Sequence, residues 1–351
     1  MGLFNFLKKE EKKEIKSEVA SNLNIESNII LNNNHDYTEE EKKALFLYSM
    51  DYPSEVLNNN YSKKFQYEFN IENCKQLHEK LINEGYFEIA KFDDIVGIYK
   101  INEIKELLDK YVIKYEKEKK EQLIELAKNN ITEEDKKEIS KELGLYVLSN
   151  KAKEYLLQYE DLIYLYNHKN WAIPYWLFKN YKREMESYFK RGDIIWAIFN
   201  DRLNDKNASL SNCRGIYNDM AEFLENENKN IDSLYYYIIC LYLDVNLYFT
   251  QNRINSYYNN QVIKVSKESI LETIYEDPIS EKIVEKINKL SRFHNEKVFQ
   301  KLFSNINLPV KIFNDTEFKN IVNDIYTESQ FNIKKYNDIA VSRMKTIIKD
   351  L

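Results

Sequence analysis

Glycine and proline are scarce in this chain, with 6 and 4 residues among 351. Folds built from many short strands need tight turns, and tight turns depend on these two residues. Their scarcity disfavours an all-β fold and favours long helices joined by few connections. The sequence therefore predicts a mainly α protein with minor β elements.

Cysteine is also rare, since only Cys74, Cys213 and Cys240 occur and no histidine cluster accompanies them. Without a Cys-x-x-Cys pair, we expect neither a zinc site nor a disulfide framework, and this pattern fits a reducing cytoplasm. Residues 2–7 are too short for the apolar core of a signal peptide. No run of about 18 apolar residues is present, so we expect no transmembrane segment.

Signatures of catalysis are missing as well. The chain has no glycine-rich phosphate loop, no Gly-x-Ser-x-Gly elbow and no His-Glu-x-x-His pair. His168 beside Trp171 is the best polar and aromatic cluster, but such a histidine is more often a surface or core residue. Asp193 is interpreted as a helix N-cap and Arg202 as the partner of a carboxylate. We therefore predict a non-catalytic protein without cofactor or metal.

The net charge of −6 excludes a uniformly basic coat for nucleic acid, although it leaves room for a local basic patch. Lysine, asparagine, isoleucine and tyrosine are all abundant, and all four have AT-rich codons. The 28 tyrosines are therefore interpreted as a trait of an AT-rich, bacterial genome rather than as a base-stacking surface.

The first 36 residues differ in composition from the remainder. An apolar tip is followed by a lysine-rich stretch, and a linker rich in serine and asparagine comes next. This flexible arm is interpreted either as an anchor that touches a membrane surface or a partner, or as a frayed chain start. We expect a small helical region over residues 37–140 and a larger, aromatic-rich helical domain over residues 141–351.

Several local signals mark the ends of elements in the first half. Thr38 and Thr132 each precede three acidic residues, which is typical of a helix N-cap with an acidic first turn. Gly85 stands where a helix C-terminal cap belongs. Residues 145–149 predict a short β-strand, and Ser149 then caps the next helix.

Residues 101–127 predict two short helices separated by a lysine-rich extension. Ile104 and Leu108 line the first helix, and Leu123 and Ile124 line the second. This order resembles the SAP motif, a helix–extension–helix module, with Lys119 and Lys120 in place of its two lysines. A looser resemblance over residues 60–245 is to SAP-domain-containing proteins of low-GC bacteria and their mobile elements.

The resemblance implies binding to DNA through lysines of the extension and of the second helix. These lysines are Lys114, Lys117, Lys119 and Lys120. Residues 110–120 contain five lysines and two glutamates, a net charge of +3, so we expect weak, salt-sensitive binding without strong sequence preference. Glu118 departs from the motif because it stands at the position of the usual glycine, and the alternative interpretation is a helical hairpin with a solvated, charged turn.

Residues 217–245 carry a second pattern, similar to one tetratricopeptide unit. In such a unit, small residues at fixed positions let two antiparallel helices approach closely and larger ones fill the gap. Here Val245 replaces the usual terminal proline. The matching residues are Met220, Ala221, Leu224, Ser233, Tyr237 and Cys240. No second copy follows at the same period, and a single unit cannot bury its own faces. The alternative function is therefore a helical scaffold or adaptor that binds a protein partner, and plain core packing remains open.

Overall fold

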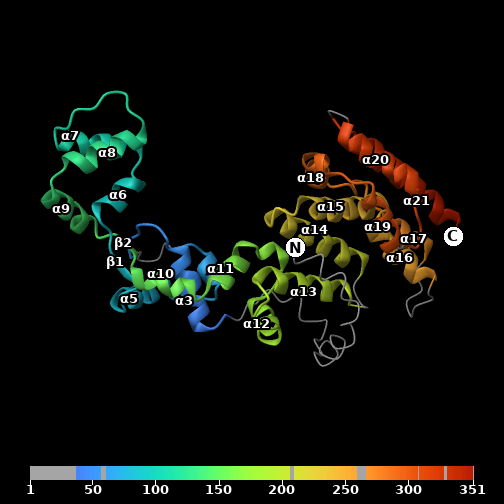
Figure 1. The fold of residues 1–351 in the computed structure, drawn as a ribbon, viewed down its shortest axis with the longest axis horizontal. Coiled ribbons are helices and arrows are strands. Elements are labelled where there is room, and N and C mark those ends of the chain that lie inside the picture. Colours follow the sequence, from blue (N-terminus) through green and yellow to red (C-terminus); the bar gives the residue numbers. More distant parts are fainter. Residues whose placement is uncertain are drawn as a thin grey trace. The chain divides into compact units, whose positions relative to one another are not determined.

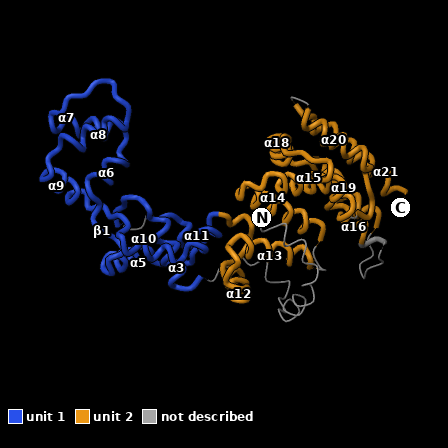
Figure 2. Tube along the Cα trace, in the orientation of Figure 1, with its two compact units in different colours: residues 1–167 blue, residues 168–351 orange. Residues whose placement is uncertain are grey.

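A computed structural model describes residues 37–56, 61–205, 209–258, 266–306, 308–327 and 330–350. The chain forms two compact units, residues 1–167 and residues 168–351 (Figure 2). The predicted mainly α fold is confirmed, because a single two-stranded sheet accompanies the helices of these ranges. The predicted N-terminal arm, residues 1–36, lies outside the described residues. No helix in the described ranges has the length and apolar character that crossing a bilayer requires.

The boundary between the two units follows Asn167, whereas the boundary predicted from the sequence follows residue 140. Strand β2 (Tyr146–Leu148) pairs with β1 (Phe87–Ile89), and α10 (Asn150–Leu157) packs against α3 (Glu39–Ser49). Residues 141–167 therefore belong to the first unit. Strand β1, which pairs with β2, lies far away in the sequence. The composition of residues 141–167 therefore did not reveal that this segment belongs to the first unit.

The first unit is built from short helices around this small sheet (Figure 1). Besides β1, β2, α3 and α10, its elements are α4 (Lys64–Tyr67), α5 (Cys74–Asn83), α6 (Phe92–Ile98), α7 (Ile101–Lys110), α8 (Lys120–Asn130), α9 (Glu133–Leu143) and α11 (Glu160–Asn167). Aromatic rings fill the region under α3, where the ring of Phe46 lies 5.0 Å from that of Phe65 and 5.8 Å from that of His78.

Helices α6 to α9 form a module inserted between the two paired strands. The antiparallel ladder joins Phe87 to Leu148 and Ile89 to Tyr146. The insert has a small core of its own, made of Phe92, Val96, Ile104, Leu108, Leu123, Ala127, Ile131 and Ile139. The chain therefore leaves one strand, folds four helices on each other and returns beside the same strand.

The local signals read from the sequence are confirmed. The Thr38 hydroxyl accepts from the Glu41 amide at 3.3 Å, and the Thr132 hydroxyl accepts from the Asp135 amide at 3.2 Å. The Ser149 hydroxyl accepts from the Ala152 amide at 3.3 Å, at the start of α10. Gly85 follows α5 with φ of 78°, a left-handed conformation that glycine adopts without steric cost.

The second unit consists of helices and their connections, with no strand among its described residues. Its elements are the 3-10 turn η3 (Lys169–Trp171), α12 (Tyr175–Glu184), α13 (Arg191–Leu203), α14 (Leu210–Asn226), α15 (Asn230–Val245), α16 (Tyr248–Tyr258), α17 (Lys267–Leu271), α18 (Glu281–Leu290), the 3-10 turn η4 (Ser291–Phe293), α19 (Lys297–Asn305), α20 (Asp315–Thr327) and α21 (Ile333–Asp350). Helix α15 is central, because α14, α16, α18, α19 and α21 all pack against it.

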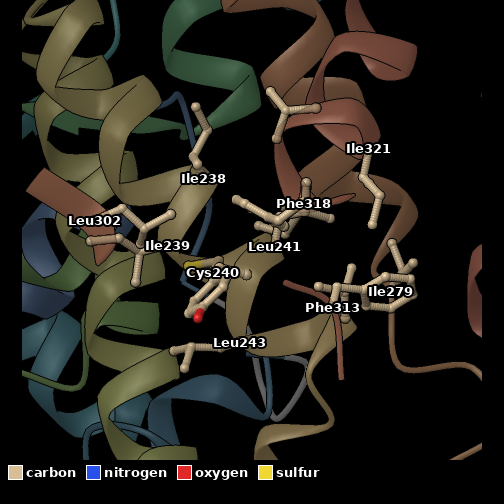
Figure 3. Close-up of a cluster of buried hydrophobic side chains, with 14 of the residues drawn as sticks. Ile238, Ile239, Cys240, Leu241, Leu243, Ile279, Leu302, Phe313, Phe318 and Ile321 are labelled. Atoms are coloured by element: carbon tan, nitrogen blue, oxygen red, sulfur yellow. The ribbon is translucent and has the colours of Figure 1, made fainter. Parts of the chain in front are cut away.

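Helix α15 is apolar around almost its whole circumference, which is typical of a helix in the middle of a core. Its residues 237–243 are buried on every side. Figure 3 shows Leu241 of α15 beside Phe318, which comes from the C-terminal third of the chain. This single helix therefore ties the C-terminal helices to α14.

A non-helical segment near Pro309 is held by buried amides. The Asn246 side-chain oxygen accepts from the Ile312 amide at 2.8 Å. Gln251 donates to the Val310 carbonyl at 2.7 Å and accepts from the Val310 amide at 3.1 Å. Both amide side chains are fully buried, so they satisfy backbone groups that would otherwise be enclosed without a partner.

Candidate nucleic-acid interface

The predicted helical pair at residues 101–127 is present as α7 and α8. Ile104, Leu108 and Leu123 are fully buried between the helices of the insert, and Ile124 is partly buried against the same cluster. Three of these side chains are thus part of the small core and Ile124 packs against it, and their burial stabilises the pair. The apolar positions hold the two helices together, and Tyr111, Ile113 and Tyr115 of the extension pack against the same cluster.

The extension spans residues 111–119 and leaves α7 through a tight turn. Val112 adopts a left-handed φ of 55°, and the Ile113 amide donates to the Leu108 carbonyl at 2.9 Å. The Tyr115 hydroxyl then donates to the Asp109 carboxylate at 3.2 Å, which ties the middle of the extension back to α7. Figure 1 shows the connection as an open arch on the side away from α9.

The four lysines singled out from the sequence differ in availability. Lys114, Lys117 and Lys119 are exposed, and none of the ion pairs within the described ranges involves them. Lys120 is half-buried, and its ammonium group donates to the Gly97 carbonyl at 3.1 Å. Lys120 therefore fastens α8 to α6, and the other three carry the charge that faces water.

The start of α8 lies at the end of the lysine-rich stretch. The Lys119 amide donates to the Gln122 side-chain oxygen at 2.9 Å, which caps the helix from within. The amides of the first helical turn have no intrahelical acceptor, and together with the helix dipole they favour an anion. A phosphate placed here would meet these amides and the ammonium of Lys119 together.

Charge is unevenly distributed over the insert. Residues 91–143 contain twelve lysines and fourteen acidic residues, so the module as a whole is slightly negative. Acidic residues gather at the start of α9, where Glu133, Glu134 and Asp135 form the first turn. A polyanion would therefore be attracted to the extension and repelled by α9, which confines any contact to a short stretch.

The second predicted segment, residues 217–245, lies in α14 and α15. The Ser233 hydroxyl donates to the Ala221 carbonyl at 2.9 Å, and the Tyr237 hydroxyl donates to the Glu225 carboxylate at 3.0 Å. Met220, Leu224 and Cys240 are fully buried. The other helices of the second unit pack against α15 and bury its residues 233–235 and 237–245.

Residues weighed for catalysis have structural roles. Asp193 is the third residue of α13 and accepts from the Lys190 amide at 2.9 Å, so it is part of a capping box rather than the N-cap. Arg202 donates to the carbonyls of Trp171 and Ala172, at 3.0 and 2.7 Å, instead of to a carboxylate. The His168 ring stacks on Trp171 with 4.3 Å between centroids. Among the described residues, no three His, Cys, Asp or Glu side chains gather as a metal site.

Comparisons of the chain with family models, with curated proteins and with solved structures found no match. The likeness to the SAP motif therefore rests on the residues quoted above, and it remains a prediction.

The sequence interpretation missed one cluster of charged side chains. Lys282, Lys286 and Lys289 line one face of α18 and pair with glutamates of α14. Their spacing of four and three residues places them on adjacent helical turns, and this spacing is the signal that would have found them. Their partners lie some sixty residues away and could not be read from α18 itself.

Proposed function

We propose that this protein binds DNA, without catalysing a reaction, through the extension between α7 and α8. The observation that carries the proposal is the exposure of Lys114, Lys117 and Lys119 with no carboxylate partner among the described residues, next to the N-terminus of α8. Three free cations and a row of helix-end amides are suited to the negative charge of backbone phosphates.

The groups on this surface do not distinguish one base sequence from another. Lysine ammonium groups and backbone amides contact phosphate oxygens, which are the same for every base sequence. We infer weak binding, with a Kd on the order of 10 µM at low salt, and little discrimination between duplexes. The acidic start of α9 limits the length of DNA that the module contacts.

The test is fluorescence anisotropy with a labelled duplex at two salt concentrations. We compare the intact chain with a Lys114, Lys117, Lys119→Ala variant, and expect the variant to lose most of the binding. The matched control is Lys63, Lys80, Lys153→Ala, which removes the same charge from exposed positions elsewhere in the first unit. Equal losses in both variants, or no binding by the intact chain at low salt, would exclude the proposed interface.

The alternative, an adaptor that binds a protein through residues 217–245, has less support. Most of α15 is buried, so a partner would have to contact α14 from outside. Capture of a partner that tolerates high salt and survives removal of the α7–α8 lysines would favour this alternative.

A further inference from the structure

The second unit contains a polar pocket of about 350 Å³. The turn between α14 and α15 forms one side, and the end of α18 with η4 forms the other. A volume of this size is at the lower end of those that hold small molecules. Phe293 and Leu290 are the apolar members of a lining that is otherwise charged or amide-bearing.

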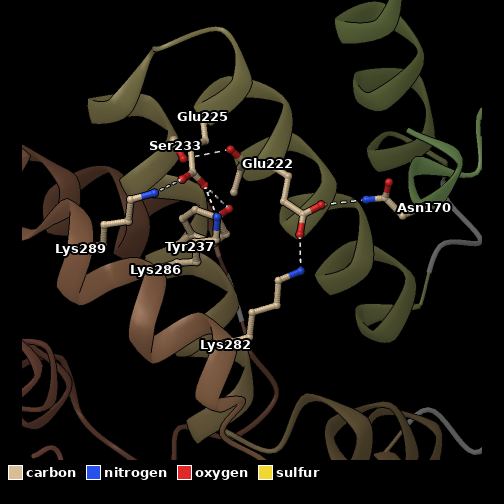
Figure 4. Close-up of polar contacts among 9 residues, drawn as sticks. Asn170, Glu222, Glu225, Ser233, Tyr237, Lys282, Lys286 and Lys289 are labelled. Atoms are coloured by element: carbon tan, nitrogen blue, oxygen red, sulfur yellow. Dashed lines mark hydrogen bonds and ion pairs between the residues drawn. The ribbon is translucent and has the colours of Figure 1, made fainter. Parts of the chain in front are cut away.

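Glu225 organises the basic side of the pocket (Figure 4). Its carboxylate accepts from Lys286 at 2.7 Å and from Lys289 at 3.0 Å, and from the Tyr237 hydroxyl at 3.0 Å. Burial by itself raises the pKa of Glu225, but these hydrogen bonds outweigh it and lower the pKa to about 2. The carboxylate is therefore charged, and two of the three hydrogen bonds that it accepts come from ammonium groups that line the pocket.

The pocket keeps an excess of positive charge. Its lining contains three basic residues, Lys286, Lys289 and Arg292, and one acidic residue, Glu225. The net charge of the lining is therefore +2. Arg292 is exposed, and its guanidinium forms no ion pair within the described ranges, although it lies 4.8 Å from the centre of the Phe293 ring. A guanidinium fork of this kind suits phosphate oxygens.

Three amides complete the lining. The side chains of Asn226, Asn228 and Asn230 form no hydrogen bond with another described residue. Each carries two donors and one acceptor, so they match an anion or the hydroxyls of a sugar. Asn228 stands in the turn with a left-handed φ of 57°, which fixes the close approach of α14 and α15.

We propose that this pocket binds a small molecule that carries a phosphate group. The two lysines and Arg292 would neutralise the phosphate, and the three amides would contact the polar remainder of the ligand. The proposal is separate from DNA binding, because the pocket belongs to the second unit and the lysines of the extension belong to the first.

The proposal is tested by isothermal titration calorimetry on the full chain, with inorganic phosphate, pyrophosphate and ribose 5-phosphate as probes. We expect saturable binding, with ribose 5-phosphate tighter than inorganic phosphate if the amides contact the organic part. Lys289→Ala combined with Arg292→Ala should weaken binding by at least about tenfold. Absence of saturable binding for all three probes up to about 10 mM would overturn the proposal, since that corresponds to less than about 3 kcal/mol.

The chain offers a matched control for charge. Lys282 lies one turn earlier on α18 and pairs with Glu222 at 2.6 Å, but it does not line the pocket. Lys282→Ala should bind the probes like the unaltered chain. If Lys282→Ala weakens binding as much as the Lys289, Arg292 variant does, the loss of affinity follows from the change in net charge. That result would contradict a defined binding site.

A further variant distinguishes a loss of binding from a loss of folding. Asn226→Asp leaves every described ion pair in place and adds a carboxylate to the lining, at an exposed position. We expect it to keep the unfolding midpoint of the unaltered chain and to weaken phosphate binding by about tenfold, because like charges repel at close range. Unchanged affinity in this variant would also overturn the proposal.

Discussion

Arg214 and Asp244 meet through two parallel hydrogen bonds inside the second unit. The Arg214 Nε atom donates to Asp244 Oδ1 at 2.9 Å, and Nη2 donates to Oδ2 at 2.8 Å. Asp244 is 1% exposed, and burial raises the pKa of its carboxyl group, while Arg214 and a backbone hydrogen bond from Ser280 favour its charged form. The pair joins α14 to the end of α15 and fixes the register of the two helices.

Removing one partner of this pair should be costly. We expect Asp244→Ala to lower the free energy of unfolding by about 3–5 kcal/mol, because a largely buried guanidinium is left without its anion. Urea denaturation followed by circular dichroism measures the change. A double variant with apolar side chains, Arg214→Met with Asp244→Leu, should recover most of the loss. A single variant as stable as the unaltered chain would contradict this account.

The Asn246 side chain should matter through the backbone groups it satisfies. Its oxygen accepts from the Ile312 amide, and its amide donates to the Tyr242 carbonyl, each at 2.8 Å. Asn246→Leu keeps the volume but leaves the Ile312 amide enclosed without a partner, whereas the Tyr242 carbonyl still accepts from the Asn246 backbone amide at 3.3 Å. We therefore expect a loss of about 1–3 kcal/mol. Thermal unfolding gives the magnitude. Asn288→Leu is the comparison, because its side chain makes one described bond, to the Ile325 carbonyl, and a smaller loss is expected there.

His78 should make the stability of the first unit depend on pH. Burial lowers the pKa of His78 from its ordinary value of 6.5 to about 4. The neutral ring therefore stabilises the fold above pH 6.5, and this stability is lost as the pH falls toward 4. We expect the free energy of unfolding to be about 2 kcal/mol lower at pH 5 than at pH 7 through this group.

The His78 effect is isolated by His78→Phe, because the carboxylates titrate alike in both proteins. Urea midpoints measured between pH 5 and pH 7 should fall less steeply in the variant. Parallel pH profiles would show that the His78 ring is not the titrating group.

The salt dependence of DNA binding should indicate how many lysines contact the DNA. If Lys114, Lys117 and Lys119 each displace one counterion, the logarithm of the binding constant should fall with the logarithm of the salt concentration with a slope of about −3. Each single Lys→Ala change should reduce the magnitude of the slope by about one. A slope that stays constant through the series would place the contact elsewhere on the chain.

The insert should be removable as a unit. The Ala90 amide donates to the Leu145 carbonyl at 2.8 Å, so these two residues stand opposite each other. Replacing residues 91–144 by Asn-Gly would join them through a two-residue hairpin turn. We expect the shortened chain to unfold cooperatively and to have lost DNA binding. Retention of full DNA binding by a folded shortened chain would contradict the proposed interface.

Much of the local structure could be predicted because it depends on a few neighbouring residues. Thr38, Thr132 and Ser149 cap helices through bonds that span three positions. The spacing of Ile104 and Leu108 places both on one face of a helix, and the fold buries that face. The sequence alone also determined the mainly α class, since scarce glycine and proline leave few tight turns.

Relationships between distant positions were decided by the tertiary structure. Strand β1 exists because residues 146–148 return beside it, and its short sequence has no signal of its own. Lys120 follows the same lysine pattern as its neighbours, yet it bonds to Gly97, because the packing of α8 on α6 brings them together. Glu225 likewise forms ion pairs with two lysines of α18, which lies far away in the sequence. Caps and periodicity act within one or two turns, whereas these pairings form only when the folded chain brings remote segments into contact.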